Sequence, residues 1–343
     1  MIFTDEQLRS AVRARLPQDV FERQPLRLLY VALLVLVIVA CGWGACRAEW
    51  HIALPLALVA GQCYAALMFF GHEIAHGAVI RSRQVQDLIL YLACAPYCVS
   101  PRLWRVWHNG VHHAHANVVD RDPDHFGTLE AYRQSGRWRR FVIQFAPGSG
   151  RLLSAFFLFL FFTAQSQGVL WVDSVRGGDF ASLNRRRAIF ESAVMLLGWI
   201  GLGMVLGAWG AIFVILIPML TANFILMSYI VTNHLLRPLG ERASSIDGTM
   251  GVRTLPILDH LHFHFSHHIE HHLFPSVSSR HYPRIRTILQ ELTGDRYLAP
   301  SHWWAVYVLY RTPRLHDGGA ELVEPVSGRR VAFSSVEEML DLH

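Results

Sequence analysis

The chain has 343 residues, of which 52% are hydrophobic and only 17% are charged. This composition is too apolar for an ordinary soluble domain, so we expect a membrane protein. The formal net charge is +5, but the basic residues do not form a pattern typical of a nucleic-acid-binding fold. Arginines that flank membrane helices explain this charge, and we therefore exclude a nucleic acid as a partner.

Four apolar segments are long enough to cross a hydrocarbon layer, which requires about 20 helical residues. They lie at 27–46, 52–71, 189–209 and 211–232. The predicted fold class is an all-α integral membrane protein with four transmembrane helices, whose membrane domain covers residues 27–312. Residues 1–26 form a cytoplasmic N-terminal segment, and residues 313–343 form a polar C-terminal tail. In this tail the sequence Ser334-Ser335-Val336-Glu337-Glu338 predicts a capping box and one short helix.

The distribution of arginine orients the four helices. Arginines are concentrated near the N-terminus, between the second and third segments and after the fourth, whereas the two short links contain only Arg47. Both termini and the long middle segment are therefore expected on the cytoplasmic side. All 31 basic residues are arginine, a bias that we interpret as that of a bacterial coding sequence. The expected location is the bacterial inner membrane.

Two further apolar stretches, 86–99 and 152–172, are not counted as crossings. The first is too short to span a bilayer, and the second is interrupted by Ser154 and by Gln165-Ser166-Gln167. Both are predicted to be interfacial or re-entrant helices. The alternative is that 152–172 crosses the membrane, which would place His108 and His268 on opposite sides.

Histidine is the second anomaly of the composition. Most of the 20 histidines gather at 72–76, 108–115 and 260–272, with one more at 234. A spacing of three or four residues, as in His72 and His76, puts two imidazoles on one helical face. A lone histidine near a membrane surface is commonly an interfacial side chain. Three clusters exceed what one four-coordinate zinc requires, but they suit two metal ions that keep room for O2.

At these residues the sequence resembles the membrane fatty acid desaturase family, over roughly residues 25–300. The resemblance rests on the order and spacing of the three histidine boxes, on the phrase Ile269-Glu270-His271-His272-Leu273-Phe274-Pro275, and on His113-Ala114-His115-Ala116-Asn117 followed by Arg121-Asp122-Pro123-Asp124. It implies a four-crossing helical fold with a cytoplasmic cap that carries the boxes. It also implies two non-haem irons, O2 as co-substrate, and the removal of two hydrogens from an unactivated acyl chain.

The family pattern gives the predicted iron ligands: His72, His76, His108, His112, His113, His268, His271 and His272, with His234 as a further ligand at the end of the fourth crossing. On an ideal helix, however, His113 lies about 140° from His108. A distortion of the helix at Gly110, or approach of the histidines to two irons from different directions, would reconcile the family pattern with the helix geometry. His115 and His264 are additional candidates near the ligands.

Ligand histidines need their second nitrogen held, usually by a carboxylate or carbonyl. Four carboxylates are close enough in sequence to do this: Glu73, Glu270, Asp122 and Asp124. Glu73 and Glu270 are favoured because they lie inside the boxes. Simple solvation at the membrane surface is the alternative, and it applies most to Asp122 and Asp124.

Other functions were weighed against this one. His72-Glu73-Ile74-Ala75-His76 also satisfies the HExxH motif, which suggests an intramembrane zinc metalloprotease but leaves the other two clusters unexplained. A metal carrier would place its ligands near the bilayer midplane, where these clusters do not lie. Within the family, a hydroxylase, an epoxygenase or an acetylenase would share the same ligands.

Two partners are expected besides the bilayer and O2. The acyl substrate arrives on a lipid, on coenzyme A or on an acyl carrier protein, and the sequence does not choose among them. No fused cytochrome b5 domain is recognisable in the sequence. Electrons are therefore expected from a separate protein, a ferredoxin or a cytochrome b5-type donor.

Overall fold

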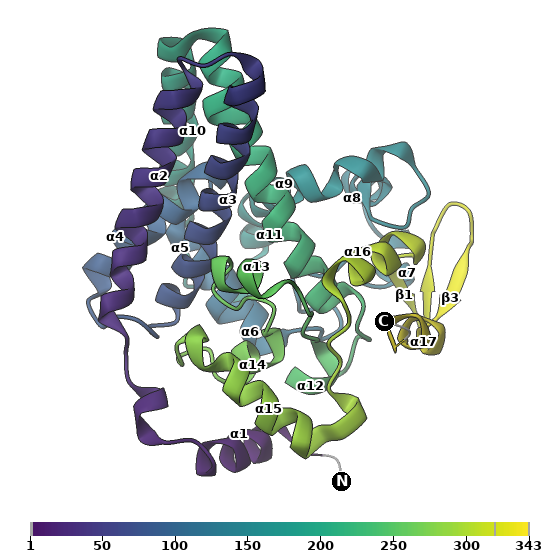
Figure 1. Cartoon of the computed structure of the whole chain (residues 1–343). Helices are drawn as coiled ribbons and strands as arrows, with labels where there is room; N and C mark the ends of the chain where they lie inside the picture. The colour runs from purple at the N-terminus through teal and green to yellow at the C-terminus, as the bar shows by residue number, and fades with distance from the viewer. Residues whose placement is uncertain (1–2, 319, 342–343) are drawn as a thin grey trace.

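The computed structural model describes residues 3–318 and 320–341 and is mostly helical (Figure 1). Its tallest part is a bundle of long apolar helices: α2 (Leu29–Ala45), α3 (Trp50–Ala75), α10 (Arg185–Gly210) and α11 (Ile217–Leu235). Large apolar side chains project outward from this bundle, and Leu36 on α2 is 67% exposed. A helix that is apolar on its outer face requires a hydrocarbon environment.

Within the described residues, four helical segments are long and apolar enough to cross a membrane: Pro25–Ala45, Trp50–Ala75, Leu152–Val175 and Arg185–Leu235. The first two agree with the predicted crossings. The fourth is 51 residues long and contains both 189–209 and 211–232. It is interrupted at Gly207, which has a φ of 70°, a value that glycine adopts at little cost. Between α10 and α11 the chain reverses at the top of Figure 1, so two helices replace one.

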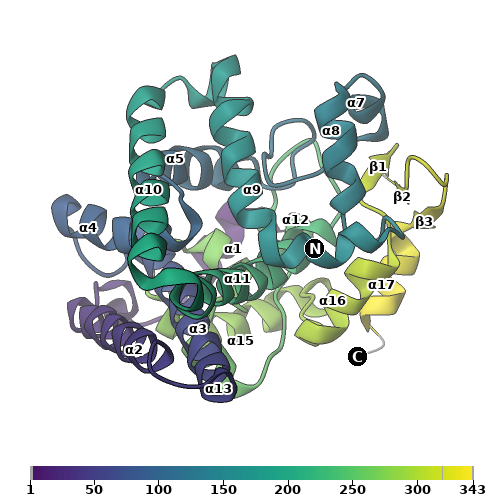
Figure 2. The same cartoon turned by 90° about the horizontal axis from the view of Figure 1, so that it is seen from above.

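The segment Leu152–Val175 is the one that the sequence analysis did not count as a crossing. Its helix α9 (Phe157–Trp171) packs against α11 and buries Phe162 and Val169. In Figure 2 both α9 and α10, which contains a predicted crossing, are seen lengthwise. Length and apolarity alone would permit a crossing. The interfacial assignment therefore stays a prediction.

The stretch 86–99 is helical but short. It forms α4 (Arg83–Cys94) and a 3-10 turn at Ala95–Tyr97. Leu90 on α4 is buried against the bundle, whereas Leu88 is 62% exposed. This amphipathic helix is too short to span a bilayer, in agreement with the expectation.

Short helices form a cap below the bundle in Figure 1. They are α1 (Asp5–Ala14), α12 (Ser245–Gly248), α13 (Pro256–Leu261), α14 (His268–Leu273) and α15 (Tyr282–Thr293). A reciprocal capping box between Thr4 and Gln7 opens α1. Leu8 and Val12 of α1 are buried in one apolar cluster with Ile285 of α15. The N-terminal segment is therefore part of the cap.

The helices between α4 and α9 are α5 (Pro101–Trp104), α6 (His113–His115), α7 (Leu129–Arg133) and α8 (Arg137–Val142). The π-helix Arg105–His112 connects α5 to α6. The second histidine box thus lies on one continuous helical segment whose winding changes along its length.

The C-terminal residues correct two expectations. After α16 (His302–Arg311), the strands β1 (Leu315–Asp317), β2 (Glu321–Val323) and β3 (Arg330–Ala332) form an antiparallel sheet in the order β1-β2-β3. The fold is therefore not entirely α-helical. Strands of three residues are too short to give a clear alternation of apolar and polar side chains. The predicted short helix is present as α17 (Phe333–Asp341), but Ser334 lies inside its first turn and does not cap it.

Candidate metal centre

The first histidine box lies at the lower end of α3. His72 is in the last turn of α3 and His76 is its C-terminal cap, so both rings leave the same side of the helix. Their ring centroids are 5.0 Å apart. His72 is only 4% exposed, because α3 is enclosed at this level by α4, α11 and the cap.

A change of helical winding explains the second box. Residues Arg105–His112 are π-helical, and their i→i+5 hydrogen bonds bring residues five apart close to the same face. Accordingly, Nε2 of His108 and Nε2 of His113 are 3.2 Å apart. His113 therefore lies beside His108, unlike on an ideal α-helix, and the distortion expected around Gly110 is present.

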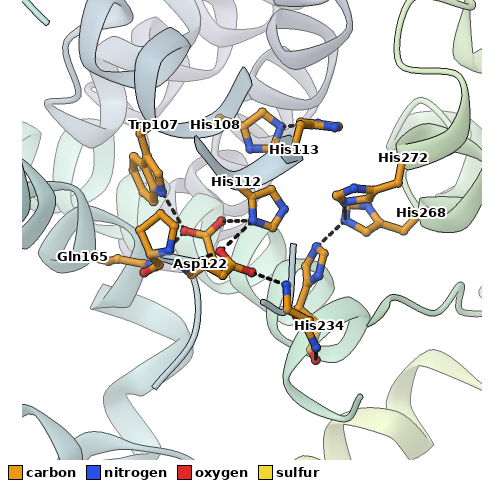
Figure 3. A network of polar contacts seen from close by, with 12 residues as sticks. Trp107, His108, His112, His113, Asp122, Gln165, His234, His268 and His272 are labelled. Atoms are coloured by element: carbon orange, nitrogen blue, oxygen red, sulfur yellow. Dashed lines mark hydrogen bonds and ion pairs between the residues drawn. The ribbon is translucent and has the colours of Figure 1, made fainter. Parts of the chain in front are cut away.

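The third box lies on α14, and its three histidines are all buried. His234, at the end of α11, reaches it from the bundle: its Nε2 lies 2.7 Å from Nε2 of His268. His272, one turn after His268, lies 3.1 Å from the same nitrogen. Figure 3 shows these rings converging from different elements.

The nine predicted histidines separate into two groups whose nitrogens could each hold one ion. The five-histidine group consists of His72, His76, His108, His113 and His271, and the four-histidine group consists of His112, His234, His268 and His272. Within each group the ligand atoms lie within 4.8 Å of one another. The two groups are neighbours, because the rings of His113 and His272 stack with centroids 4.5 Å apart.

The electrostatics of both groups favour a bound cation. Burial, reinforced by the neighbouring histidines, holds the pKa of His271 and of His272 well below the usual range, so both rings are neutral. Neutral imidazole is the form that binds metals. In addition, Nε2 of His76 is buried without a hydrogen-bond partner among the described residues. Such an atom is costly unless a ligand satisfies it.

Asp122 and Asp124, the two less favoured of the four candidate carboxylates, hold His112. Oδ1 of Asp122 lies 2.9 Å from Nδ1 of His112, and Oδ2 of Asp124 lies 3.3 Å from the same nitrogen. Although burial alone would lower it, the charges of Asp122 and Asp124 raise the pKa of His112 to about 9. With Nδ1 donating to the carboxylate, Nε2 faces the four-histidine group as a strongly basic atom.

Glu73 and Glu270 act differently from the expectation. Glu73 forms a buried ion pair with Arg27 and accepts a hydrogen bond of 2.7 Å from the hydroxyl of Ser279. Glu270 accepts a hydrogen bond from the hydroxyl of Tyr297. The recorded contacts of these two carboxylates, within the described part of the chain, include no histidine ring. They hold the cap together instead, which sequence proximity to the boxes did not indicate.

Two positioning residues escaped the sequence analysis. The hydroxyl of Tyr282 lies 3.2 Å from Nδ1 of His271 and occupies the place expected for a carboxylate. The side-chain amide of Asn117 donates to the carbonyl of His234 at 3.0 Å, and its backbone N–H donates to Asp122 at 2.8 Å. Asn117 belongs to the sequence His113-Ala114-His115-Ala116-Asn117, which is part of the family resemblance. Its φ of 54° suits asparagine. Tyr282 had no comparable signal.

The two additional candidates do not join the metal groups. His115 lies outside both groups and is partly exposed. His264 lies instead beside Asp259 and His267, in a separate cluster.

A small cavity adjoins both groups. Its lining includes His72 from the first group and His112 from the second, together with the apolar side chains Met68, Phe162 and Leu226. Trp107 and Gln165 border its polar end, where each donates to Asp124, at 2.7 and 3.0 Å (Figure 3). An apolar lining with a few polar groups is typical of a site for an apolar molecule held at a few polar points.

Fold and site together define a membrane protein with a candidate two-metal centre beside an apolar cavity. Residues 48–304 match the family described as fatty acid desaturase. The sn-1 oleoyl-lipid 12-desaturase of Synechocystis sp. is 23% identical, over 94% of this chain and 91% of that protein. The sn-1 acyl-lipid omega-3 desaturase (ferredoxin) of the same organism is 22% identical, over 90% and 87%. The chloroplastic omega-6 fatty acid desaturase of Spinacia oleracea is 24% identical, over 88% and 68%.

The chain therefore belongs to the fatty acid desaturase family. It is a membrane oxidoreductase of lipid metabolism, and the resemblance that the histidine boxes indicated is confirmed.

Proposed function

We propose that the chain is an O2-dependent desaturase that introduces a double bond into a fatty acyl chain, with one iron in each histidine group. The observation that carries this proposal is the pairing of two groups of mostly buried imidazoles with an apolar cavity that touches both. The donor set fits iron, because imidazole is a good iron ligand and a six-coordinate ion held by four or five imidazoles keeps a position for O2.

When bound, the irons would supply the activation of O2 that oxidises an unactivated carbon chain. The protein's own contribution is to position the substrate. Met68, Phe162 and Leu226 surround an apolar chain, and the burial of His108 and His112 at 5% and 1% exposure keeps water away from the centre. Asp122 orients His112, and Tyr282 orients His271.

The substrate class follows from the cavity and from the relatives. The relatives include acyl-lipid desaturases, and the helices of this chain are long and apolar enough to cross a bilayer. We therefore propose that the acyl chain is carried by a membrane lipid. Acyl coenzyme A and acyl carrier protein are the competing carriers. Presenting the same acyl group on each carrier to the purified enzyme distinguishes them.

The other reactions of the family share this site. Hydroxylation, epoxidation and conversion of an alkene to an alkyne would need the same ligands and differ in how the chain lies beside the irons. A zinc metalloprotease is disfavoured by a specific observation. Both oxygens of Glu73 are engaged, by Arg27 and Ser279, so this carboxylate is not directed at a metal-bound water.

The proposed electron donor is a separate acidic protein such as a ferredoxin, which also appears in the name of one relative. Opposite charges steer such encounters, and the formal charge of this chain is +5. We propose a bacterial inner membrane location with the centre on the cytoplasmic side. Turnover with ferredoxin should decline as ionic strength rises, and indifference to salt would contradict the steering.

The decisive experiment is expression in a host followed by mass spectrometry of its lipids and acyl thioesters. A product lighter by two hydrogens supports desaturation, and one heavier by an oxygen atom indicates hydroxylation or epoxidation. Metal analysis of the purified protein should give about two irons per chain. One zinc without iron would overturn the proposal.

A further inference from the structure

A third cluster of metal-binding side chains lies on the cap, outside both histidine groups. It consists of Asp259 on α13 and of His264 and His267, which lie between α13 and α14. Their ligand atoms lie within 4.8 Å of one another. The cluster is not enclosed: the side chains of Asp259 and His264 are 17% and 18% exposed, so an ion can enter from solvent.

The two imidazoles converge on one carboxylate oxygen. Nδ1 of His264 lies 2.7 Å from Oδ2 of Asp259, and Nε2 of His267 lies 3.5 Å from the same atom. The second distance is long for a hydrogen bond. Around a tetrahedral zinc with bonds of about 2.0 Å, neighbouring ligand atoms are about 3.3 Å apart. The observed separations lie on either side of this spacing.

The surrounding structure presents these ligands in a fixed arrangement. Ser266 donates its hydroxyl to Oδ1 of Asp259, which leaves Oδ2 toward the histidines. Phe263 and His264 both have left-handed backbone conformations, with φ of 53° and 56°. Such conformations are uncommon for these residue types and persist where the surroundings impose them. The reversal turns the ring of His264 back toward α13.

We propose that Asp259, His264 and His267 bind a third metal ion, a borderline divalent cation such as Zn2+. Two imidazoles and one carboxylate are a common zinc donor set, and water from the exposed side fills the fourth position. The ion links Asp259 on α13 to His267, the N-cap residue of α14, and so fixes the start of α14. None of the three ligands belongs to the iron groups, so the site does not depend on the proposed desaturase activity.

The test is metal uptake by the purified, iron-containing protein. The protein is equilibrated with Zn2+, freed of unbound ions and analysed for zinc and iron in one sample. The wild type should gain about one zinc per chain with its iron unchanged. Asp259→Asn and His264→Ala should each retain less than about a tenth of that zinc at the same concentration, and equal iron.

His260→Ala is the matched control, since His260 is an exposed histidine of α13 outside the cluster and should leave zinc uptake unchanged. Absorption by Co2+ substituted at the site is a second readout, and the visible bands of a tetrahedral ion should disappear in His264→Ala. The proposal is overturned if the wild type gains no zinc, if zinc enters only as iron leaves, or if both variants bind zinc as the wild type does. Melting temperatures identify a variant that fails to fold, in which case His264→Gln replaces it.

Discussion

Arg27, at the start of the first apolar helix, forms a buried ion pair with Glu73, in the middle of the first histidine box. The guanidinium group also contacts the hydroxyls of Ser278 and Ser279, just after the third box. Three segments that are distant in sequence therefore meet at Glu73. This contact gives Glu73 a structural role in the cap. The HExxH pattern would instead make it the catalytic glutamate of a protease.

Glu73→Gln is expected to destabilise the protein by about 3 kcal/mol, because it leaves Arg27 as an uncompensated buried charge. Some desaturase activity should remain, since the histidine ligands are untouched. Melting temperature and product formation in the same preparation measure the two effects. In Arg27→Met/Glu73→Gln, the loss should be smaller than the sum of the single losses. Complete inactivation of a well-folded Glu73→Gln protein would argue for a direct catalytic role.

Removal of one ligand should empty one metal group only. His272→Ala is expected to lower the iron content from about two to about one per chain and to abolish desaturation, because the four-histidine group would retain three ligands. His115→Ala is the matched control in the second box, and it should keep both irons because His115 lies outside both groups. Elemental analysis gives the counts. Full iron retention in His272→Ala would contradict the assignment.

Asp122→Asn should weaken iron binding at the four-histidine group by about 10- to 100-fold, because a neutral amide no longer orients and polarises His112. Competition with a chelator measures this affinity. Asp120→Asn serves as the control: Asp120 is exposed in the same loop, and its φ of 58° suits asparagine. Equal affinities for the two variants would show that the Asp122 contact is not functional.

The cavity predicts a variant that separates substrate binding from metal binding. Leu226→Trp fills space beside the irons and should reduce turnover by about 100-fold through displacement of the acyl chain, with the iron content preserved. Leu197→Trp is its control, because Leu197 is 65% exposed on α10. If Leu226→Trp retains both iron and full activity, the substrate does not use this cavity.

The C-terminal sheet should loosen in mild acid. Burial, with a smaller effect of Arg314, lowers the pKa of His316 on β1 to about 3, so the folded state holds this ring neutral. The unfolded chain takes up a proton below about pH 6.5, and stability is therefore lost as the pH falls below that value. Between pH 7.5 and pH 5 this difference amounts to about 2 kcal/mol.

His316→Gln removes this titration and should reduce the loss of melting temperature between those two pH values. His125, whose Nε2 lies 3.2 Å from Nε2 of His316, is partly buried beside it and keeps a contribution of its own. An unchanged pH dependence in His316→Gln would assign the acid sensitivity to other groups.

The sequence alone determined the family and the mostly helical membrane fold. Apolar runs of about 20 residues predict membrane helices, and nine ligand candidates followed from the resemblance of the histidine boxes to the family, without coordinates. Local patterns also predicted α2, α3 and the pair α10 and α11. They missed the short strands β1, β2 and β3, whose stability comes from packing rather than from their own residues.

Only the tertiary structure decided how the nine histidines divide into groups of five and four, because this depends on where distant helices meet. The π-helical winding of Arg105–His112, which brings His113 beside His108, was likewise beyond an ideal-helix argument. The same holds for the carboxylates. Glu73 is adjacent to His72 in sequence but pairs with Arg27, whereas Asp122 holds a histidine ten positions away. A hydrogen bond depends on position in space, which neighbouring sequence does not fix.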